Sequence, residues 1–338
     1  MPKKTTMSDI AAELGISTVT VSKALSGQKG VSEEMRRRII EIAEERGYQK
    51  SSSAREIESF KIGILIGSRY LGNIDSFYGH MYQIFSAKAA KMGSFTMLEV
   101  LADEDEKNLE PPKLIGDGNV DAIVIMGALN EDYLRMLDEK LSTPVFYMDF
   151  SDRKHQKDSV ISGSFYGAYI LTNYLFDKGH TEIGYVGTIL ATPSITDRYL
   201  GYCRALMEHG LEAKKEWVLD DRDMKTQVVD MENNIKLPKK MPTAFVCNCD
   251  LSASMFIKYL KEKGYRVPQD ISVVGYDDFV YSGSNDIGIT TYKVDMEEMV
   301  RRTLKRILHT LKGEQYRGGL SIVEGHLVER DSVKRLTL

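Results

Sequence analysis

The sequence lacks any long hydrophobic segment. Within its 338 residues, no apolar run reaches the roughly 18 residues that a membrane-spanning helix needs. No hydrophobic stretch follows the two lysines near the N-terminus, so nothing there has the form of a secretory signal. Hydrophobic residues make up 42% and charged residues 28%, a composition typical of globular proteins. We therefore expect a cytoplasmic protein without a membrane partner.

Cysteine is scarce, and the common catalytic and cofactor motifs are missing. The three cysteines are Cys203, Cys247 and Cys249, and a lone Cys-x-Cys pair supplies too few ligands for a tetrahedral zinc site. There is no Gly-x-Gly-x-x-Gly, no Walker loop and no Gly-x-Ser-x-Gly turn. The six histidines form no His-x-x-x-His pair. We expect neither a metal nor a cofactor, and the sequence favours a binding protein over an enzyme.

Positive charge is not in excess either. The net charge is −4, and residues 1–50 contain nine Lys or Arg against seven Asp or Glu. Bulk charge therefore does not predict nucleic-acid binding, which has to be argued from motif and placement.

Three short helices are predicted within residues 1–48. The first is capped by Thr6 and ends at Gly15, the second follows an N-cap at Ser17, and the third begins at Ser32. Two helices joined by a glycine turn and braced by a third form a helix-turn-helix, whose second helix enters the major groove of DNA. A helical bundle that binds no nucleic acid is the alternative. The exposed face of the second helix would carry Ser17, Thr18, Val19, Ser22 and Lys23.

Several motifs in this segment are similar to the headpiece of the lactose-repressor (LacI/GalR) family. They are SDIA at 8–11, LGIS at 14–17, TVSKAL at 20–25, VS at 31–32, IA at 42–43 and GY at 47–48. The resemblance implies that Thr18, Val19 and Lys23 read bases, while Ser17 and Ser22 help to hold the DNA backbone. The family usually has arginine at the position of Lys23, and lysine lacks the bidentate fork of arginine.

Residues 49–60 are polar and rich in serine, which is typical of a flexible linker. The family resemblance instead implies a hinge helix that orders on DNA and inserts an apolar wedge into the minor groove. Ala54, Arg55 and Ile57 match the hinge motif, with Ile57 at the wedge position. The negatively charged Glu56 and Glu58 depart from it, and both interpretations stay open.

From residue 61 onward, predicted strands alternate with predicted helices. The strands are 62–67, 95–101, 122–126, 145–148, 183–187, 244–247 and 271–275, and the helices include 80–91, 166–178, 197–209 and 251–263. This alternation predicts two doubly wound α/β lobes, at about 61–160 and 161–290, that face each other across a cleft. Ligands in such folds bind beyond the carboxyl ends of the strands.

The LacI/GalR resemblance extends into this half. It rests on DKGHTEI at 177–183, RYLGY at 198–202, PTAF at 242–245, VPQDISVVGYDD at 267–278 and VERDS at 328–332. It implies a periplasmic-binding-protein-like (type I) sensor domain over 61–338, after the headpiece (1–48) and the hinge (49–60). One lobe would combine 61–160 with 293–320, and the other 161–290 with 321–338.

A sugar or sugar-like effector is expected in the cleft, because polyhydroxylated ligands need aromatic faces together with forked polar groups. The residues that the resemblance assigns to this role, with the neighbouring Tyr166, are Phe77, Tyr78, Tyr166, Arg198, Asp250 and Asp277. Two amide positions of the family are replaced here, by Gly163-Ser164 and by Cys249. The ligand could therefore be smaller, less hydroxylated or not a sugar.

The favoured function is a homodimeric regulator, more specifically a repressor, that binds operator DNA in response to the effector. A solute-binding protein with the same cleft and no DNA role is the alternative. An enzyme using the Asp277-Asp278 pair is a third hypothesis, but no nucleophile or cofactor motif accompanies that pair.

Overall fold

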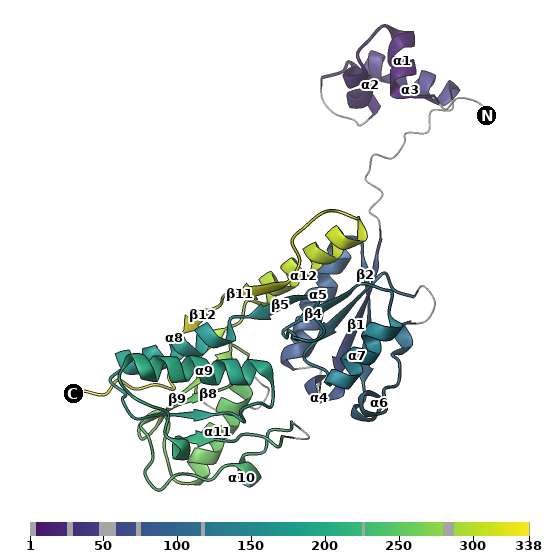
Figure 1. Cartoon of the computed structure of the whole chain (residues 1–338). Helices are drawn as coiled ribbons and strands as arrows, with labels where there is room; N and C mark the ends of the chain where they lie inside the picture. The colour runs from purple at the N-terminus through teal and green to yellow at the C-terminus, as the bar shows by residue number, and fades with distance from the viewer. Residues whose placement is uncertain are drawn as a thin grey trace. The chain divides into compact units, whose positions relative to one another are not determined.

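The computed structural model describes residues 5–25, 30–46, 59–71, 76–115, 119–224, 227–279 and 287–337. The chain divides into two compact units, Met1–Glu58 and Ser59–Leu338. Figure 1 labels their helices and strands.

The N-terminal unit contains the three helices expected from the sequence: α1 (Met7–Leu14), α2 (Thr18–Leu25) and α3 (Glu33–Glu45). Thr6 and Asp9 form a reciprocal capping box at the start of α1, which satisfies two otherwise unpaired backbone N–H groups. Gly15 ends α1 with φ 63°, a left-handed conformation that glycine adopts without steric cost. The turn into α2 follows directly, so this glycine sets the helix-turn-helix.

A small apolar core holds these helices together. Ile10 of α1, Val21 of α2 and Ile39 of α3 are each at most 1% exposed. A guanidinium nitrogen of Arg36 donates to the carbonyl of Ala24 at 2.8 Å, near the C-terminal end of α2. Arg36 therefore ties α3 to α2 rather than serving only as a solvated charge.

The second unit contains two six-stranded sheets. The first has the order β11-β5-β4-β3-β1-β2 and the second the order β12-β10-β9-β8-β6-β7, with every pairing parallel except β10–β12. Their strands are β1 (Lys61–Gly67), β2 (Phe95–Leu101), β3 (Ala122–Met126), β4 (Val145–Met148), β5 (Asp158–Ser162), β6 (Ile183–Val186), β7 (Val218–Leu219), β8 (Ala244–Cys247), β9 (Ser272–Asp277), β10 (Thr290–Lys293), β11 (Leu320–Val323) and β12 (His326–Val328). Five of these strands, β5, β7, β10, β11 and β12, fall outside the seven that the sequence predicted.

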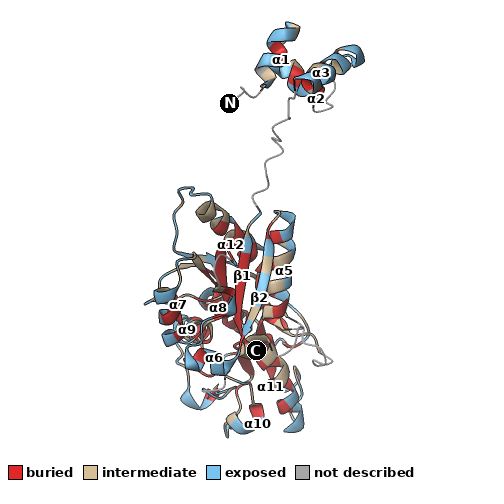
Figure 2. Cartoon of the chain, turned by 90° about the vertical axis from the view of Figure 1, so that its right-hand side faces the viewer, coloured by how far each residue is buried: buried red, intermediate tan, exposed pale blue. Residues whose placement is uncertain are grey.

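Helices cover both faces of each sheet, as expected for a doubly wound fold. They are α4 (Ser68–Leu71), α5 (Phe77–Lys91), α6 (Asp103–Asn108), α7 (Glu131–Lys140), α8 (Ser164–Asp177), α9 (Pro193–Glu208), α10 (Met231–Asn234), α11 (Asp250–Glu262) and α12 (Met296–Leu311). Alternate residues of one strand enter different cores: Ile64 packs in the cluster that contains residues of α5 and α12, while Leu65 packs in the cluster that contains residues of α7. The central strands are accordingly buried on both sides, whereas the edge strand β2 is largely exposed (Figure 2).

The chain passes between the two sheets three times, and each passage lies two or three residues later than the expected boundary. Strand β5 (Asp158–Ser162) pairs with β4, so the first passage follows residue 162 rather than 160. Strand β10 (Thr290–Lys293) pairs with β9 of the second sheet, so that lobe extends to residue 293 rather than 290. Strand β11 (Leu320–Val323) pairs with β5 of the first sheet, so the first lobe extends to 323 rather than 320. The sequence of a short strand next to a crossover does not indicate the sheet to which it belongs, because that depends on the strand with which it pairs.

Candidate DNA-reading helix and interlobe cleft

The second helix of the headpiece presents the predicted DNA-facing residues to solvent. Ser17, Thr18, Val19, Ser22 and Lys23 are all exposed, and Val19 is 61% exposed despite its apolar side chain. Val21 and Ala24, on the other side of α2, are buried in the headpiece core. Ser17 also caps the helix, since its Oγ accepts from the backbone N of Thr20 at 3.1 Å. The hinge residues Ala54, Arg55 and Ile57 lie outside the described residues.

A cavity of about 570 Å³ lies at the carboxyl ends of the parallel strands, where the two lobes meet. The first lobe contributes residues of α4 and α5 together with Asp149, which follows β4. The second lobe contributes the start of α9, Arg222 with residues 227–229, the β8–α11 turn and Asp277 at the end of β9. Four of the six predicted effector residues line it: Phe77, Tyr78, Arg198 and Asp277.

Tyr166 and Asp250 are not among the residues that line the cavity. Tyr166 lies in the first turn of α8, is 47% exposed and stacks on Tyr169 with ring centroids 6.0 Å apart. Asp250 is only 4% exposed, and its Oδ2 accepts from the backbone N of Phe279 at 2.9 Å. The β8–α11 turn instead presents Asn248 and Cys249 to the cavity. The sequence therefore predicted the correct turn, but Asp250 is not the residue of that turn that faces the cavity.

The first-lobe wall is aromatic. The rings of Tyr70 and Tyr78 lie 4.9 Å apart and those of Phe77 and Tyr78 lie 5.3 Å apart, measured between centroids. The Tyr78 hydroxyl donates to Oδ2 of Asp149 at 2.8 Å. Burial raises the pKa of Asp149, outweighing the opposing effects of Arg198, Tyr78 and Ser162. This wall offers flat apolar faces with the half-buried carboxylate of Asp149 among them.

Arg198 projects from α9 into the second-lobe wall and is 6% exposed. Its Nη1 donates to the carbonyl of Asn248 at 2.6 Å, and its guanidinium carbon lies 3.7 Å from the ring centroid of Tyr276. Its Nε has no hydrogen-bond partner among the described residues. A buried, charged donor without a partner is costly, so this atom is a natural point for a ligand oxygen.

Asp277 faces Arg198 across a loose ion pair of 3.5 Å. Burial raises the pKa of Asp277 well above its usual range, the carboxylates of Asp250 and Asp149 add to the rise, and Arg198 opposes it. The backbone of Asp277 has φ 116°, which is strained for a residue other than glycine. Its neighbour Asp278 instead forms ion pairs with Arg330 and Lys293, so the two carboxylates do not act on one reacting group.

A second arginine, Arg222, also lines this wall, and its side chain is 12% exposed. It makes a forked contact to Asp221, with Nε–Oδ1 at 3.0 Å and Nη2–Oδ2 at 2.7 Å, and also donates to Oδ1 of Asn248 at 3.1 Å. Burial alone would raise the pKa of Asp221, but the hydrogen bonds and positive charge of Arg222 outweigh it and lower the pKa to about 2. The sequence does not reveal this cluster, because Asn248 lies 26 residues after Arg222 and no motif joins it to the Asp221-Arg222 pair.

Comparisons with known proteins agree with these two regions. Residues 6–51 match the model for bacterial regulatory proteins of the lacI family, and residues 172–333 match a periplasmic binding protein-like domain. Over 335 residues the chain is 27% identical to the HTH-type transcriptional repressor PurR of Vibrio campbellii, covering 98% of this chain and 99% of the relative. The PurR of Mannheimia succiniciproducens is 25% identical with the same coverage.

The chain thus carries a lacI-family headpiece at residues 6–51 and a periplasmic binding protein-like domain over residues 172–333. Its fold is also that of solved family structures. The lac repressor dimer bound to operator and the anti-inducer ONPF matches with a TM-score of 0.65 and 23% identity, covering 98% of this chain and 100% of that one. The transcriptional regulator CelR in complex with cellobiose matches with a TM-score of 0.67 and 21% identity, covering 97% of this chain and 100% of that one.

The lacI-family headpiece, the periplasmic binding protein-like domain and the similarity to PurR repressors over nearly the whole length identify this chain as a DNA-binding transcriptional regulator with a ligand-binding domain, rather than an enzyme or a solute-binding protein without a DNA role. Within the described ranges, no helix is long and apolar enough to cross a membrane. No group of three or more His, Cys, Asp or Glu in those same ranges could hold a metal ion.

Proposed function

We propose that this lacI-family regulator represses transcription by binding an operator as a homodimer, and that a small polar molecule in the interlobe cleft changes its affinity for DNA. The observation that carries the proposal is the partly unsatisfied Arg198, buried opposite Asp277 in a cavity that both lobes line. A ligand held by groups from both lobes favours a closed arrangement of the lobes, and any change in their arrangement can be coupled to DNA binding.

The exposed face of α2 supports a role for Thr18, Val19 and Lys23 in reading bases, with Ser17 and Ser22 near the DNA backbone. Lys23→Ala is expected to weaken binding to a selected operator by about 1–3 kcal/mol if the lysine contacts a base. The matched control is Lys258→Ala, since Lys258 is an exposed lysine of α11 outside the headpiece. Fluorescence anisotropy with labelled operator measures both variants, and unchanged affinity of Lys23→Ala would remove this residue from the interface.

Ala54, Arg55 and Ile57 belong to the proposal as a hinge that contacts the minor groove, with Ile57 as the apolar wedge. Ile57→Gly is expected to weaken operator binding and to leave ligand affinity in the cleft unchanged. If footprinting with the wild-type protein shows straight operator DNA, the wedge is wrong and the linker interpretation replaces it.

A sugar or another polyol is the effector class that the cleft supports best. Tyr70, Phe77 and Tyr78 offer aromatic faces, and Arg198 and Asp277 offer a donor and an acceptor for hydroxyl groups. The cellobiose complex of the structurally similar CelR supports this class. Cys249 lines the cavity at a position where an amide was expected, which favours a ligand with fewer hydroxyl contacts there. A thermal-shift screen of sugars and sugar phosphates identifies the ligand, and no stabilisation by any of them would contradict the class.

The edge strand β2 supports a homodimer formed through the first lobe. Phe95, Met97, Leu98 and Val100 are between 38% and 68% exposed on a strand whose outer edge is unpaired within the described sheet (Figure 2). Exposed apolar residues on an edge strand favour association. Because a dimer has two-fold symmetry, the operator should be nearly palindromic. The dimer and the operator would meet in the cytoplasm. Analytical ultracentrifugation should show a dimer at micromolar concentration that Met97→Glu with Val100→Lys converts to monomer; a wild-type monomer would contradict this.

A further inference from the structure

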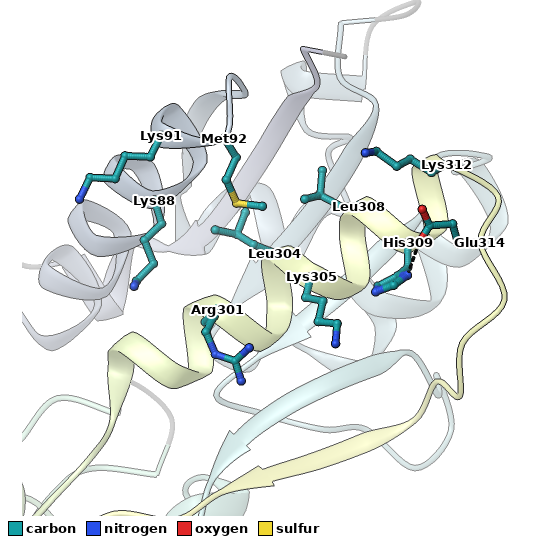
Figure 3. A pocket seen from close by; sticks show the side chains of 10 residues that line it. All are labelled: Lys88, Lys91, Met92, Arg301, Leu304, Lys305, Leu308, His309, Lys312 and Glu314. Carbon is teal, nitrogen blue, oxygen red and sulfur yellow. Dashed lines mark ion pairs between the residues drawn. The ribbon is translucent and has the colours of Figure 1, made fainter. Parts of the chain in front are cut away.

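A second cavity lies on the first lobe, away from the cleft, between the C-terminal part of α5 and the length of α12. Its volume is about 530 Å³. Helix α5 contributes Lys88, Lys91 and Met92, and the remaining lining residues belong to α12 and the turn after it: Arg301, Leu304, Lys305, Leu308, His309, Lys312 and Glu314. Figure 3 shows Met92, Leu304 and Leu308 between the two helices, with the charged side chains around them. We call this cavity the α5–α12 groove.

Positive charge gathers in the α5–α12 groove although the whole chain has a net charge of −4. Two of its cationic residues have acidic partners, Lys88 with Glu297 and Arg301 with Glu298, and the His309 ring lies against Glu314. In the part of the chain that the structure describes, no ion pair reaches Lys91, Lys305 or Lys312. Arg301 and Lys305 are one helical turn apart, a spacing at which like charges destabilise a helix. Such a cluster is better explained by an anion that neutralises it than by helix stability.

The floor of the α5–α12 groove is apolar. Leu304 is 2% exposed, Leu308 is partly buried, and Met92 at the end of α5 is 39% exposed. The methionine side chain is flexible and adapts to ligands of different shape. An inorganic anion alone would leave this floor uncovered, whereas a molecule with both an apolar body and a phosphate would use both parts. The volume is within the range of small-molecule sites.

We propose that the α5–α12 groove is a second ligand site of this regulator and that it takes a small organic phosphate with an apolar body. In Figure 3 the ammonium groups of Lys91, Lys305 and Lys312 point in different directions from the two helices, so these flexible side chains turn toward the groove to hold the phosphate. Met92, Leu304 and Leu308 cover the apolar part. This site shares no lining residue with the interlobe cleft.

Helix α12 is well placed to transmit occupancy of this groove to the lobes. It begins directly after the passage from β10 and precedes β11, from which the chain returns to the second lobe. Arg302 of α12 donates to the carbonyl of Ile322 on β11 at 3.0 Å, and Arg306 donates to the carbonyl of Ser159 on β5 at 3.1 Å. Both strands lead into interlobe passages. A ligand that fixes α12 against α5 therefore acts on segments that must move when the lobes change their arrangement.

The test uses the full-length protein and isothermal titration calorimetry with phenyl phosphate, inorganic phosphate and benzyl alcohol as probes. We expect phenyl phosphate to bind about tenfold or more tightly than inorganic phosphate, because burial of the ring adds to the charge interaction. Benzyl alcohol, which lacks the charge, should not bind detectably. Lys305→Glu and Lys91→Glu should each weaken phenyl phosphate binding about fivefold or more, and Lys258→Glu on α11 is the matched control with unchanged binding.

Thermal unfolding confirms that each variant is folded before titration. Retained phenyl phosphate binding in Arg198→Ala would support a site separate from the cleft. The proposal is overturned if phenyl phosphate does not bind the wild type, or if Lys305→Glu binds it as the wild type does. It is also overturned if an acidic peptide binds the groove and phenyl phosphate does not, because the groove then serves a protein partner. Weaker operator binding of Lys305→Glu without any probe would assign the groove to the DNA interface instead.

Discussion

Two arginines, the buried Arg198 and the partly buried Arg222, lie in the same wall of the interlobe cleft, but their hydrogen bonding differs. Arg222 makes a forked pair with Asp221 and a further bond to Asn248, so its charge is fully compensated inside the protein. Arg198 has one hydrogen bond, to the carbonyl of Asn248, a loose ion pair with Asp277 and an Nε without a partner among the described residues. The comparison separates a residue that builds the wall from one that remains available to a ligand.

Two carboxylates near the ends of strands β8 and β9, Asp250 and Asp277, also differ in whether they face the cavity. Asp250 turns away from the cavity and holds the backbone of Phe279, while Asp277 lines the cavity opposite Arg198. A Cβ atom at Gly275 would lie 2.0 Å from Oδ1 of Asp250, so this carboxylate packs directly on the β9 backbone. Residue type alone thus does not distinguish a ligand contact from a structural one.

The largest expected effect is on folding stability when the compensated arginine is removed. Arg222→Met leaves Asp221 buried without its partner and should lower the free energy of unfolding by about 3–5 kcal/mol at pH 7. In the wild type, the pKa of Asp221 of about 2 is below its unfolded value, so the stabilisation is present at neutral pH and is lost as the pH falls toward 2. Urea denaturation measures the loss. Arg266→Met, which breaks an exposed forked pair with Asp270, is the control without a resolvable change.

The pH dependence of stability tests the assignment of Asp250 as structural. Burial raises its pKa to about 7, so the folded protein binds more protons than the unfolded chain between about pH 4 and pH 7, and stability falls as the pH rises through that range. Asp250→Asn keeps an oxygen acceptor for Phe279 and should remove this fall. The free energy of unfolding of the variant at pH 8 should then exceed that of the wild type by on the order of a few kcal/mol. Parallel pH profiles of the wild type and Asp250→Asn would show that Asp250 does not titrate in this range.

Removal of the available arginine should cost less stability than removal of Arg222. Arg198→Ala loses the hydrogen bond to Asn248 and the contact with the Tyr276 ring, about 1–3 kcal/mol in total. The cost is limited because Arg198 lowers the pKa of Asp277, so removal of the arginine lets this buried carboxyl take up a proton and lose its charge. Ligand affinity in the cleft should fall on the order of 100-fold. A stability loss equal to that of Arg222→Met would erase the distinction between the two arginines.

The smallest effect is expected in the aromatic wall of the first lobe. Tyr78→Phe removes the hydrogen bond to Asp149 and keeps the ring, so the free energy of unfolding should fall by about 1 kcal/mol. If the ring is the part that contacts the ligand, calorimetry should find ligand affinity nearly unchanged. A large loss of affinity would show that the hydroxyl, or the position of Asp149, takes part in binding.

The headpiece helices and the two α/β lobes could be predicted from the sequence. Helix caps at Thr6 and Gly15 defined the headpiece, and alternation of apolar strands with helices defined the two lobes, because both signals are local. Arg198 and Asp277 were placed by the motifs that contain them and Phe77 by its position after the first strand, and all three line the cavity, while their contact with a ligand stays a prediction.

What the sequence could not predict depends on contacts between distant residues. The Asp221–Arg222–Asn248 cluster assembles from two loops, and Asp149 becomes a cavity residue only because Tyr78 and Arg198 are near it. Asp250 was placed in the cavity because it follows a strand, but the direction of its side chain is set by the loop that contains Phe279. The sheet to which β11 belongs likewise depends on its pairing with β5.

The most direct test of the central claim is a titration of labelled operator DNA with the protein, in the presence and absence of the ligand identified by thermal shift. The account predicts that saturating ligand changes the operator affinity of the wild type by about 5- to 150-fold. Arg198→Ala should bind operator as the wild type does without ligand, and its affinity should not change when ligand is added. Equal operator affinity of the wild type with and without ligand would contradict the account, because the cleft would then have no influence on DNA binding.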